Sequence, residues 1–266
     1  MSFRLVIVLA ALLGAGAVSA QTTQNPKPPA TNAPTAPAPA TTPQPQAATA
    51  PAGNPAEPAN SAPETAQNAN AAPQPGDANA GQGKAGACGA CHGIDGNPAS
   101  SQYPKLAGQH EDYIARQLQL FKERHRDNPI MAGFAAPLQP QDMHDIGAYF
   151  ATKTSLPGVA DAKLVERGQA LYRGGDKKGV PACMACHGPD GRGNAGAAYP
   201  QLAGQYADYV SAKLKEWHDG KTWGDDDRAK IMPTIAKQLS EDDIAALASY
   251  IEGLHSASAG AATAAK

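Results

Sequence analysis

Residues 88–98 read CGACHGIDGNP, and residues 183–193 read CMACHGPDGRG. Each stretch places two cysteines three positions apart, with a histidine directly after the second. The chain has four cysteines in total, so these two stretches use all of them. A doubled Cys-x-x-Cys-His motif with no cysteine left over indicates two equivalent local structures that serve the same chemistry.

The spacing of the motif predicts covalent attachment of haem. On a helical turn, residues i and i+3 project from the same face, so Cys88 and Cys91 can reach the two vinyl groups along one edge of a porphyrin and form thioethers. His92 then lies close enough to ligate the iron. This is the c-type haem attachment signature, and it predicts two haem c groups. The equivalent residues of the second copy are Cys183, Cys186 and His187.

Three other interpretations of the motif are a redox disulfide, half of a zinc site and a chance match. A thioredoxin-like disulfide expects a βαβ context, which the sequence does not show. A zinc site would need donors from both copies to meet across about 90 residues of chain, and its four-cysteine version leaves the adjacent histidines without a role.

An internal repeat extends beyond these motifs. YPKLAGQ, from Tyr103, matches YPQLAGQ, from Tyr199, and the segments that begin at Ile130 and Ile231 also match. The order of the motifs is the same in both copies. The repeat predicts two homologous domains, 81–153 and 160–256.

Each copy has a helical pattern. Apolar residues recur at three and four positions within residues 110–126, and residues 240–251 open with Ser240 as an N-cap and Asp243 three positions later. A third helix is expected just before the second cysteine motif, in residues 161–173. The predicted fold class is all-α, two small domains whose cores would be marginal without a large apolar cofactor.

The N-terminal part of the chain has a different character. Residues 1–20 combine a basic residue, an apolar run and small residues suited to cleavage, which predicts a secretory signal peptide. An uncleaved membrane anchor is the alternative, although the run is short for a span. Residues 21–80 hold more than half of the chain's 24 prolines and no aromatic residue, so we expect a disordered linker.

The repeat also points to the sixth ligand of each iron. Met131 and Met232 are the one pair among the five methionines that is equivalent in the two copies, and each is expected in a proline-containing loop. Met143 aligns with Ile244 on a helical stripe, which indicates packing. No histidine outside the motifs is repeated. The prediction is His/Met coordination of both irons, with His92, Met131, His187 and Met232 as ligands.

Two prolines are candidates to orient the histidines. The second ring nitrogen of a metal-bound histidine usually donates to a carbonyl or carboxylate. Tyr103-Pro104 and Tyr199-Pro200 follow His92 and His187 at similar short distances, so the carbonyls of Pro104 and Pro200 are the predicted acceptors. The alternative is that these prolines only form a wall at the haem edge.

The sequence resembles cytochrome c4, a periplasmic dihaem member of the class I cytochromes c. The resemblance is carried by the paired CxxCHG, the YPxLAGQ segments, the single methionine after each of them and the closing helix. The resemblance covers residues 81–256. It implies two cytochrome c domains related by a pseudo-twofold, with neighbouring haems that pass electrons from a quinol-oxidising complex toward a terminal oxidase. The long linker, the glycine-rich segment before Cys88 and the extra residues 217–230 depart from that pattern.

Charge and ligand chemistry limit the other possible functions. The formal net charge is −2 and no basic stripe occurs, so a nucleic-acid partner is not expected. The acidic run of residues 225–227 is interpreted as a solvated loop, with a docking patch for a basic partner as the alternative. A free electron carrier has two alternatives. The chain could be an electron-transfer subunit of a dehydrogenase or oxidase complex, associated with the membrane through its partner or through an uncleaved signal. The other alternative is a dihaem peroxidase.

Overall fold

The computed structural model describes residues 72–255. Both repeats lie within a single compact unit. The predicted signal peptide and most of the predicted linker lie outside the described residues.

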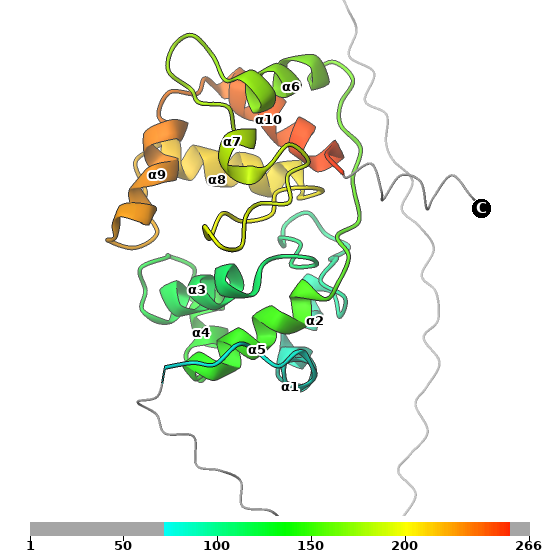
Figure 1. Ribbon diagram of the computed structural model, residues 1–266, viewed down its shortest axis with the longest axis vertical. Coiled ribbons are helices and arrows are strands. Elements are labelled where there is room, and N and C mark those ends of the chain that lie inside the picture. Colours follow the sequence, from blue (N-terminus) through cyan, green and yellow to red (C-terminus); the bar gives the residue numbers. More distant parts are fainter. Residues whose placement is uncertain (1–71, 256–266) are drawn as a thin grey trace, which may run out of the picture. The chain divides into compact units, whose positions relative to one another are not determined.

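Each repeat forms its own group of helices (Figure 1). The first repeat contains α1 (Ala78–Lys84), the 3₁₀ turn η1 (Ala85–Ala87), α2 (Gly89–His92), α3 (Glu111–Lys122), α4 (Pro129–Ala135) and α5 (Pro140–Ala151). The second contains α6 (Val165–Gly174), α7 (Met184–His187), α8 (Ala207–His218), α9 (Asp227–Ala236) and α10 (Glu241–Gly253).

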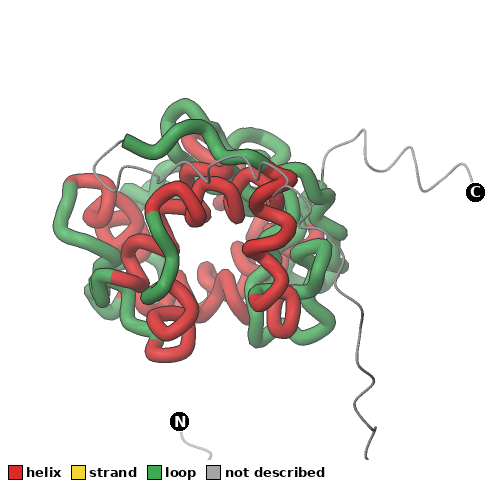
Figure 2. The backbone as a smooth tube through the Cα atoms, turned by 90° about the horizontal axis from the view of Figure 1, so that it is seen from below, coloured by secondary structure: helices red, strands yellow, loops and turns green. Residues whose placement is uncertain are grey.

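The all-α fold class is confirmed for the described part of the chain. Figure 2 shows helices joined by long loops, and between residues 72 and 255 the single β feature is an isolated bridge between Asn194 and Tyr199. None of the helices in this range is both long and apolar enough to cross a membrane.

The helices expected from local sequence signals are present. α3 lies within the stretch where apolar periodicity predicted a helix, and α6 covers most of the helix expected in residues 161–173 and ends one residue later, at Gly174. α10 begins with the expected capping box, in which the Ser240 side chain accepts a hydrogen bond from the Asp243 backbone and the Asp243 carboxylate accepts one from Ser240. These starts and stops depend on contacts within a few residues, which explains why they can be predicted locally.

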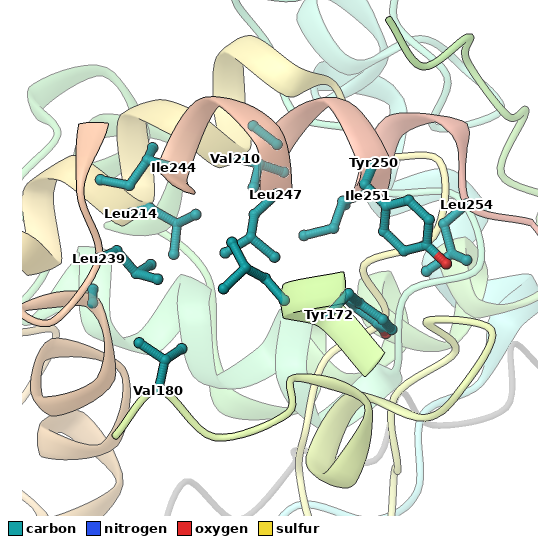
Figure 3. Close-up of a cluster of buried hydrophobic side chains, with 13 residues drawn as sticks. Tyr172, Val180, Val210, Leu214, Leu239, Ile244, Leu247, Tyr250, Ile251 and Leu254 are labelled. Carbon is teal, nitrogen blue, oxygen red and sulfur yellow. The ribbon is translucent and has the colours of Figure 1, made fainter. Parts of the chain in front are cut away.

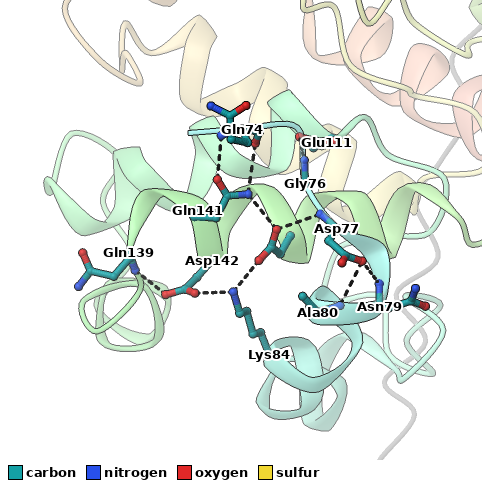
Figure 4. A network of polar contacts seen from close by, with 11 residues as sticks. Gln74, Gly76, Asp77, Asn79, Ala80, Lys84, Glu111, Gln139, Gln141 and Asp142 are labelled. Atoms are coloured by element: carbon teal, nitrogen blue, oxygen red, sulfur yellow. Dashed lines mark hydrogen bonds and ion pairs between the residues drawn. The ribbon is translucent and has the colours of Figure 1, made fainter. Parts of the chain in front are cut away.

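α1 begins at Ala78 and includes part of the glycine-rich segment before Cys88. The Asp77 side chain caps α1 by accepting hydrogen bonds from the backbone of Asn79 and Ala80. At the other end of α1, Lys84 Nζ lies 2.7 Å from an Asp142 oxygen and 2.5 Å from an Asp145 oxygen (Figure 4). The contacts that hold this helix therefore come from α5, about 60 residues away.

The glycine of α1 is needed for close helix packing. A Cβ at Gly81 would lie 1.9 Å from the backbone oxygen of Asp145 on α5. The second repeat has the same arrangement between α6 and α10, where a Cβ at Gly168 would lie 2.2 Å from the backbone oxygen of Ala246. In both repeats, the first helix approaches the last one so closely that only a residue without a side chain fits.

Each repeat has its own apolar core. In the first, α3 and α5 contribute most of the buried side chains, and in the second the core gathers around α10 (Figure 3). The fully buried large side chains of the two cores are Tyr172, Phe150, Met143, Ile146, Leu171, Ile244 and Leu247. One cysteine of each motif, Cys88 or Cys183, packs against the core of its own repeat.

The extra residues of the second repeat contact the first repeat. The Arg126 guanidinium lies 3.5 Å from the ring centroid of Trp223. Asp226 caps α9 through Ala229 and also lies 2.9 Å from Arg116 of the first repeat. Residues 225–227 are all exposed, as expected of a solvated segment, and Asp226 in addition forms an ion pair with the first repeat.

Candidate haem sites

Both Cys-x-x-Cys-His motifs form a single helical turn. In the first, the backbone N–H groups of Cys91 and His92 point to the Cys88 carbonyl, at 3.3 and 2.9 Å. The second motif has the same two hydrogen bonds with the same lengths, onto the carbonyl of Cys183. This geometry places the two cysteines of each motif on one face of the turn.

A glycine ends each of these turns. Gly93 and Gly188 are the C-caps of α2 and α7, with φ of 77° and 79°. Residues with a side chain rarely adopt this backbone conformation. The glycine that the two CxxCHG motifs share therefore reverses the chain directly after the histidine and leads it toward the YPxLAGQ segment.

The two histidines are buried and oriented in the same way. Each is 6% exposed. His92 Nδ1 lies 2.9 Å from the carbonyl oxygen of Pro104, and His187 Nδ1 lies 3.0 Å from that of Pro200. Because a carbonyl can only accept, Nδ1 must carry the proton, which leaves the lone pair of Nε2 available to a metal.

Burial controls the protonation of the donor atoms. It lowers the pKa of His92 and of His187, and this effect exceeds the opposing effect of the hydrogen bonds to the proline carbonyls. It also raises the pKa of Cys88, and that of Cys183 to about 11. At neutral pH, both imidazoles are therefore neutral, and both of these cysteines are thiols.

The YPxLAGQ segment is held against the motif by backbone hydrogen bonds. The N–H groups of Leu106 and Ala107 both donate to the carbonyl of Gly96, at 2.8 and 3.1 Å, and the N–H of Gly108 donates to Phe150 at the end of α5. The second repeat has the same three bonds, from Leu202 and Ala203 to Gly191 and from Gly204 to Ile251. These bonds position the proline carbonyls next to the histidines.

The repeated methionines lie in helices, so the prediction of a proline-containing loop is wrong. Met131 is in α4, where Pro129 occupies the first turn and the side chain of Asn128 accepts a hydrogen bond from the Met131 backbone. Met232 is in α9, directly before Pro233. Pro129 is well tolerated in the first turn of α4 because the N–H that it lacks has no helical partner there. Pro233, by contrast, lies inside α9.

The two methionines are partly buried and pack against the same cores as the cysteines. Met131 contacts the core that Cys88 also contacts, and Met232 contacts the core that Cys183 contacts. Met143, by contrast, is 1% exposed within α5, as is its counterpart Ile244 in α10. The burial of Met143 agrees with its interpretation as a packing residue.

A cluster of possible metal ligands that the sequence did not indicate lies elsewhere in the first repeat. Within residues 72–255, Glu111, Asp112 and His144 are the one group of three such side chains whose ligand atoms lie within 4.8 Å of one another. Glu111 Oε1 already accepts hydrogen bonds from His144 Nδ1 and from the Gly76 backbone, at 2.9 and 2.8 Å. The cluster therefore links the N-terminal segment to α3 and α5.

The donors of the cysteine motifs suit haem better than zinc. A tetrahedral zinc site requires donor atoms that converge on one point. Within the described part of the chain, the thiols and imidazoles of the motifs form no such group. Instead, each repeat presents two free thiols on one face of a turn, an adjacent histidine with its Nε2 lone pair available, and a thioether in the same core. This set fits a covalently attached porphyrin.

Comparison with known proteins defines the class first. The family model of cytochrome c matches residues 78–153 and 165–255, which correspond to the two repeats. The all-α fold and the paired Cys-x-x-Cys-His turns are thus those of two cytochrome c domains in tandem.

Relatives then define the family within this class. The chain is 49% identical over 181 residues to cytochrome c4 of Pseudomonas aeruginosa, a match that covers 68% of this chain and 90% of the relative. The crystal structure of reduced recombinant cytochrome c4 from Pseudomonas stutzeri matches with a TM-score of 0.65 and 45% identity, over 68% of this chain and all of that one. The chain belongs to the cytochrome c4 family, and its cofactors are two haem c groups.

A more distant relative has a more specific name. The thiosulfate dehydrogenase electron acceptor of Thiomonas intermedia is 36% identical over 174 residues, which is 63% of this chain and 78% of the relative. Cytochrome c4 is an electron-transfer cytochrome, and this relative is also named for accepting electrons.

Proposed function

We propose that the chain is an electron carrier in which Cys88, Cys91 and Cys183, Cys186 hold the two haems, with the axial ligands His92, Met131 and His187, Met232. The observation that carries the proposal is that the two repeats have the same donor geometry. Each histidine donates from Nδ1 to a proline carbonyl, and each methionine lies in the equivalent helix of its repeat. The bound haems supply one-electron redox chemistry.

The residues around each site have distinct roles in this proposal. Pro104 and Pro200 hold the imidazole planes in place and increase the basicity of the ligating nitrogen through the hydrogen bond at Nδ1. With haem bound, the sulfur of Met131 or Met232 would fill the position that an enzyme leaves open for substrate, and it would favour the reduced state. A site that is closed in this way transfers electrons and does not bind peroxide, so the carrier role is favoured over a dihaem peroxidase.

We further propose that the protein works in the periplasm between a quinol-oxidising complex and a terminal oxidase. The proposal depends on the signal-like residues 1–20 and on the membership of the cytochrome c4 family. Residues 21–80 would serve as a linker, and the two domains would comprise residues 81–153 and 160–256, with α1 added to the first.

A second candidate function is electron acceptance from a specific dehydrogenase, with the chain as a subunit of a larger complex. The relative that supports it is the thiosulfate dehydrogenase electron acceptor, which matches this chain less closely than the cytochromes c4 do. A bound partner could also associate the protein with a membrane.

The covalent attachment of haem is tested by extraction. Protein purified from a host with a cytochrome c maturation system is expected to keep two haems per chain after denaturation and acid-acetone treatment, because thioether bonds survive these conditions. Cys88→Ala and Cys183→Ala should each weaken one attachment and destabilise their own domain. Haem that is fully extractable, or stoichiometric zinc in its place, would contradict the proposal.

The carrier role is tested by combining redox and kinetic measurements. A redox titration is expected to show two one-electron steps, and stopped-flow mixing should show rapid oxidation of the reduced protein by membranes that contain a terminal oxidase. Hydrogen peroxide turnover should be negligible because both axial positions are filled. Rapid reduction by a purified thiosulfate dehydrogenase, with slow reduction by a quinol-oxidising complex, would favour the second candidate function instead.

A further inference from the structure

Two peptide groups occupy a special position between the repeats. The peptide that joins Pro104 to Lys105 accepts the hydrogen bond of His92 at its carbonyl, and the peptide that joins Pro200 to Gln201 accepts that of His187. A group that binds the N–H of the same peptide can therefore change the strength of the carbonyl's hydrogen bond to the histidine.

A glutamine of the opposite repeat binds each of these N–H groups. The Lys105 N–H donates to Gln205 Oε1 at 2.9 Å, and the Gln201 N–H donates to Gln109 Oε1 at 2.9 Å. Both glutamines also donate in return, from Nε2 to the carbonyl of the same residue, at 2.9 Å for Lys105 and 3.0 Å for Gln201. The two glutamines are the last residues of the two YPxLAGQ segments, so the arrangement is reciprocal.

The hydrogen-bond pattern settles the orientation of both amide groups. Gln109 Oε1 accepts a second N–H from His110 at 3.0 Å, and Gln205 Oε1 accepts a second N–H from Tyr206 at 3.1 Å. If either amide were flipped, its NH₂ group would face two N–H donors and its oxygen would face a carbonyl. Each side-chain oxygen must therefore point at the peptide that the histidine uses.

We infer that Gln109 and Gln205 are positioning residues, each of which tunes the haem of the opposite domain through the peptide that its axial histidine contacts. A peptide whose N–H is hydrogen-bonded is more polarised, so its carbonyl is a stronger acceptor. A stronger acceptor at Nδ1 makes the ligating Nε2 more basic. A more basic ligand stabilises the ferric state, so each glutamine lowers the reduction potential of the haem in the other domain.

The inference rests on the proposed axial role of His92 and His187, and its consequence is specific. Gln205 of the second domain acts on the haem of the first, and Gln109 of the first domain acts on the haem of the second. Covalent and hydrogen bonds across the interface thus connect each histidine to a glutamine of the other domain. His92 is connected through the 104–105 peptide to Gln205, and His187 is connected through the 200–201 peptide to Gln109.

The test uses Gln109→Leu and Gln205→Leu in the full-length haem-loaded protein. The potentials are followed by two-dimensional NMR at stepwise redox poise, with each haem assigned from resonances of its own domain. Gln109→Leu should raise the potential of the second haem, and Gln205→Leu that of the first. The difference between the two potentials therefore changes in opposite directions in the two variants. In each case, the Nδ1–H resonance of the affected histidine should move upfield as its hydrogen bond weakens.

Two control variants break hydrogen bonds across the same interface without involving either peptide N–H. Gln201→Met removes the bond from Gln201 Nε2 to the Ala107 carbonyl, and Ser101→Ala removes the bond from Ser101 Oγ to Asp208. Neither control should move either histidine resonance, because the backbone N–H of Gln201 and of Lys105 keeps its glutamine acceptor.

The glutamate variants separate the acceptor role from loosening of the interface. Gln109→Glu and Gln205→Glu lose the Nε2 donor, as the leucine variants do, but keep an acceptor oxygen. They should leave the Nδ1–H resonance at its original position or move it downfield, whereas leucine moves it upfield. The same upfield shift in both substitutions would overturn the inference.

Other results would also overturn it. Equal shifts of both potentials in each leucine variant would show that only interface packing had changed, and unchanged potentials would show no coupling. Failure of the proposed function looks different, because it would appear in the unmodified protein as the absence of covalent haem or of methionine ligation.

Discussion

Replacement of Met131 or Met232 by leucine is expected to abolish the weak sulfur-to-iron absorption band of one haem and to lower the potential of that haem. Leucine has nearly the same volume as methionine but no donor atom, so the packing stays similar while the ligand is lost. A thioether stabilises ferrous iron, and axial ligands set haem potentials over a range of about 0.8 V. The change should therefore be a sizeable part of that range.

The two substitutions should affect different haems. Met131 packs against the core of the first repeat and Met232 against that of the second, so each variant should move one step of the redox titration and leave the other near its original position. The vacated position should also become open to external ligands such as cyanide or peroxide, which can be followed by the absorption spectrum.

Met143→Leu is the matched control for these ligand variants. Met143 is 1% exposed and packs in the core of the first repeat, next to α3. The swap to leucine conserves volume and should cost less than about 1.5 kcal/mol of stability, with no effect on the absorption band. Loss of the band in Met143→Leu but not in Met131→Leu would show that the repeat alignment had selected the wrong ligand.

Gly81→Ala in α1 and Gly168→Ala in α6 are expected to destabilise the protein strongly, unlike alanine at the other glycine of the same helix. The added Cβ would lie 1.9 Å from a backbone oxygen in the first case and 2.2 Å in the second. Since a backbone oxygen cannot rotate away, the helices must separate, and we expect a loss of about 3 kcal/mol, at the upper end for overpacked sites. Thermal unfolding should shift down by roughly 6–12 °C.

Both helices contain a control glycine on an open face. A Cβ added at Gly83 in α1 or at Gly174 in α6 would have no packing neighbour within 4 Å. Gly83→Ala should therefore stabilise the protein by about 0.5–1 kcal/mol, because alanine loses less conformational entropy in a helix. Equal destabilisation by Gly81→Ala and Gly83→Ala would contradict the close contact between α1 and α5.

Local contacts determine the features that the sequence predicted correctly. The cysteine turns depend on the i to i+3 geometry of a single helical turn, and α10 depends on a capping box of four residues. The internal repeat added information of another kind, because equivalent positions in the two copies distinguish Met131 and Met232 from Met143. The cofactor and the fold class followed from these features alone.

Distant residues determine the helix that the sequence did not predict. The segment before Cys88 is rich in glycine, which disfavours a helix in isolation, yet it forms α1 because α5 accepts its glycine face and pairs with Lys84. The loop predicted around Met131 was wrong for a local reason, because Pro129 stands in the first turn of α4, where proline is compatible with a helix.

The sequence by itself determined the chemistry of this protein: two covalent haem motifs, the donor atoms next to them, and two copies of a small helical domain. Only the tertiary structure decided how the copies act on one another. Gln109 and Gln205 look like ordinary polar residues at the end of a repeated motif, and each meets the peptide behind the opposite histidine about 100 positions away. A local pattern cannot specify such a contact, because packing of the two domains brings the residues together.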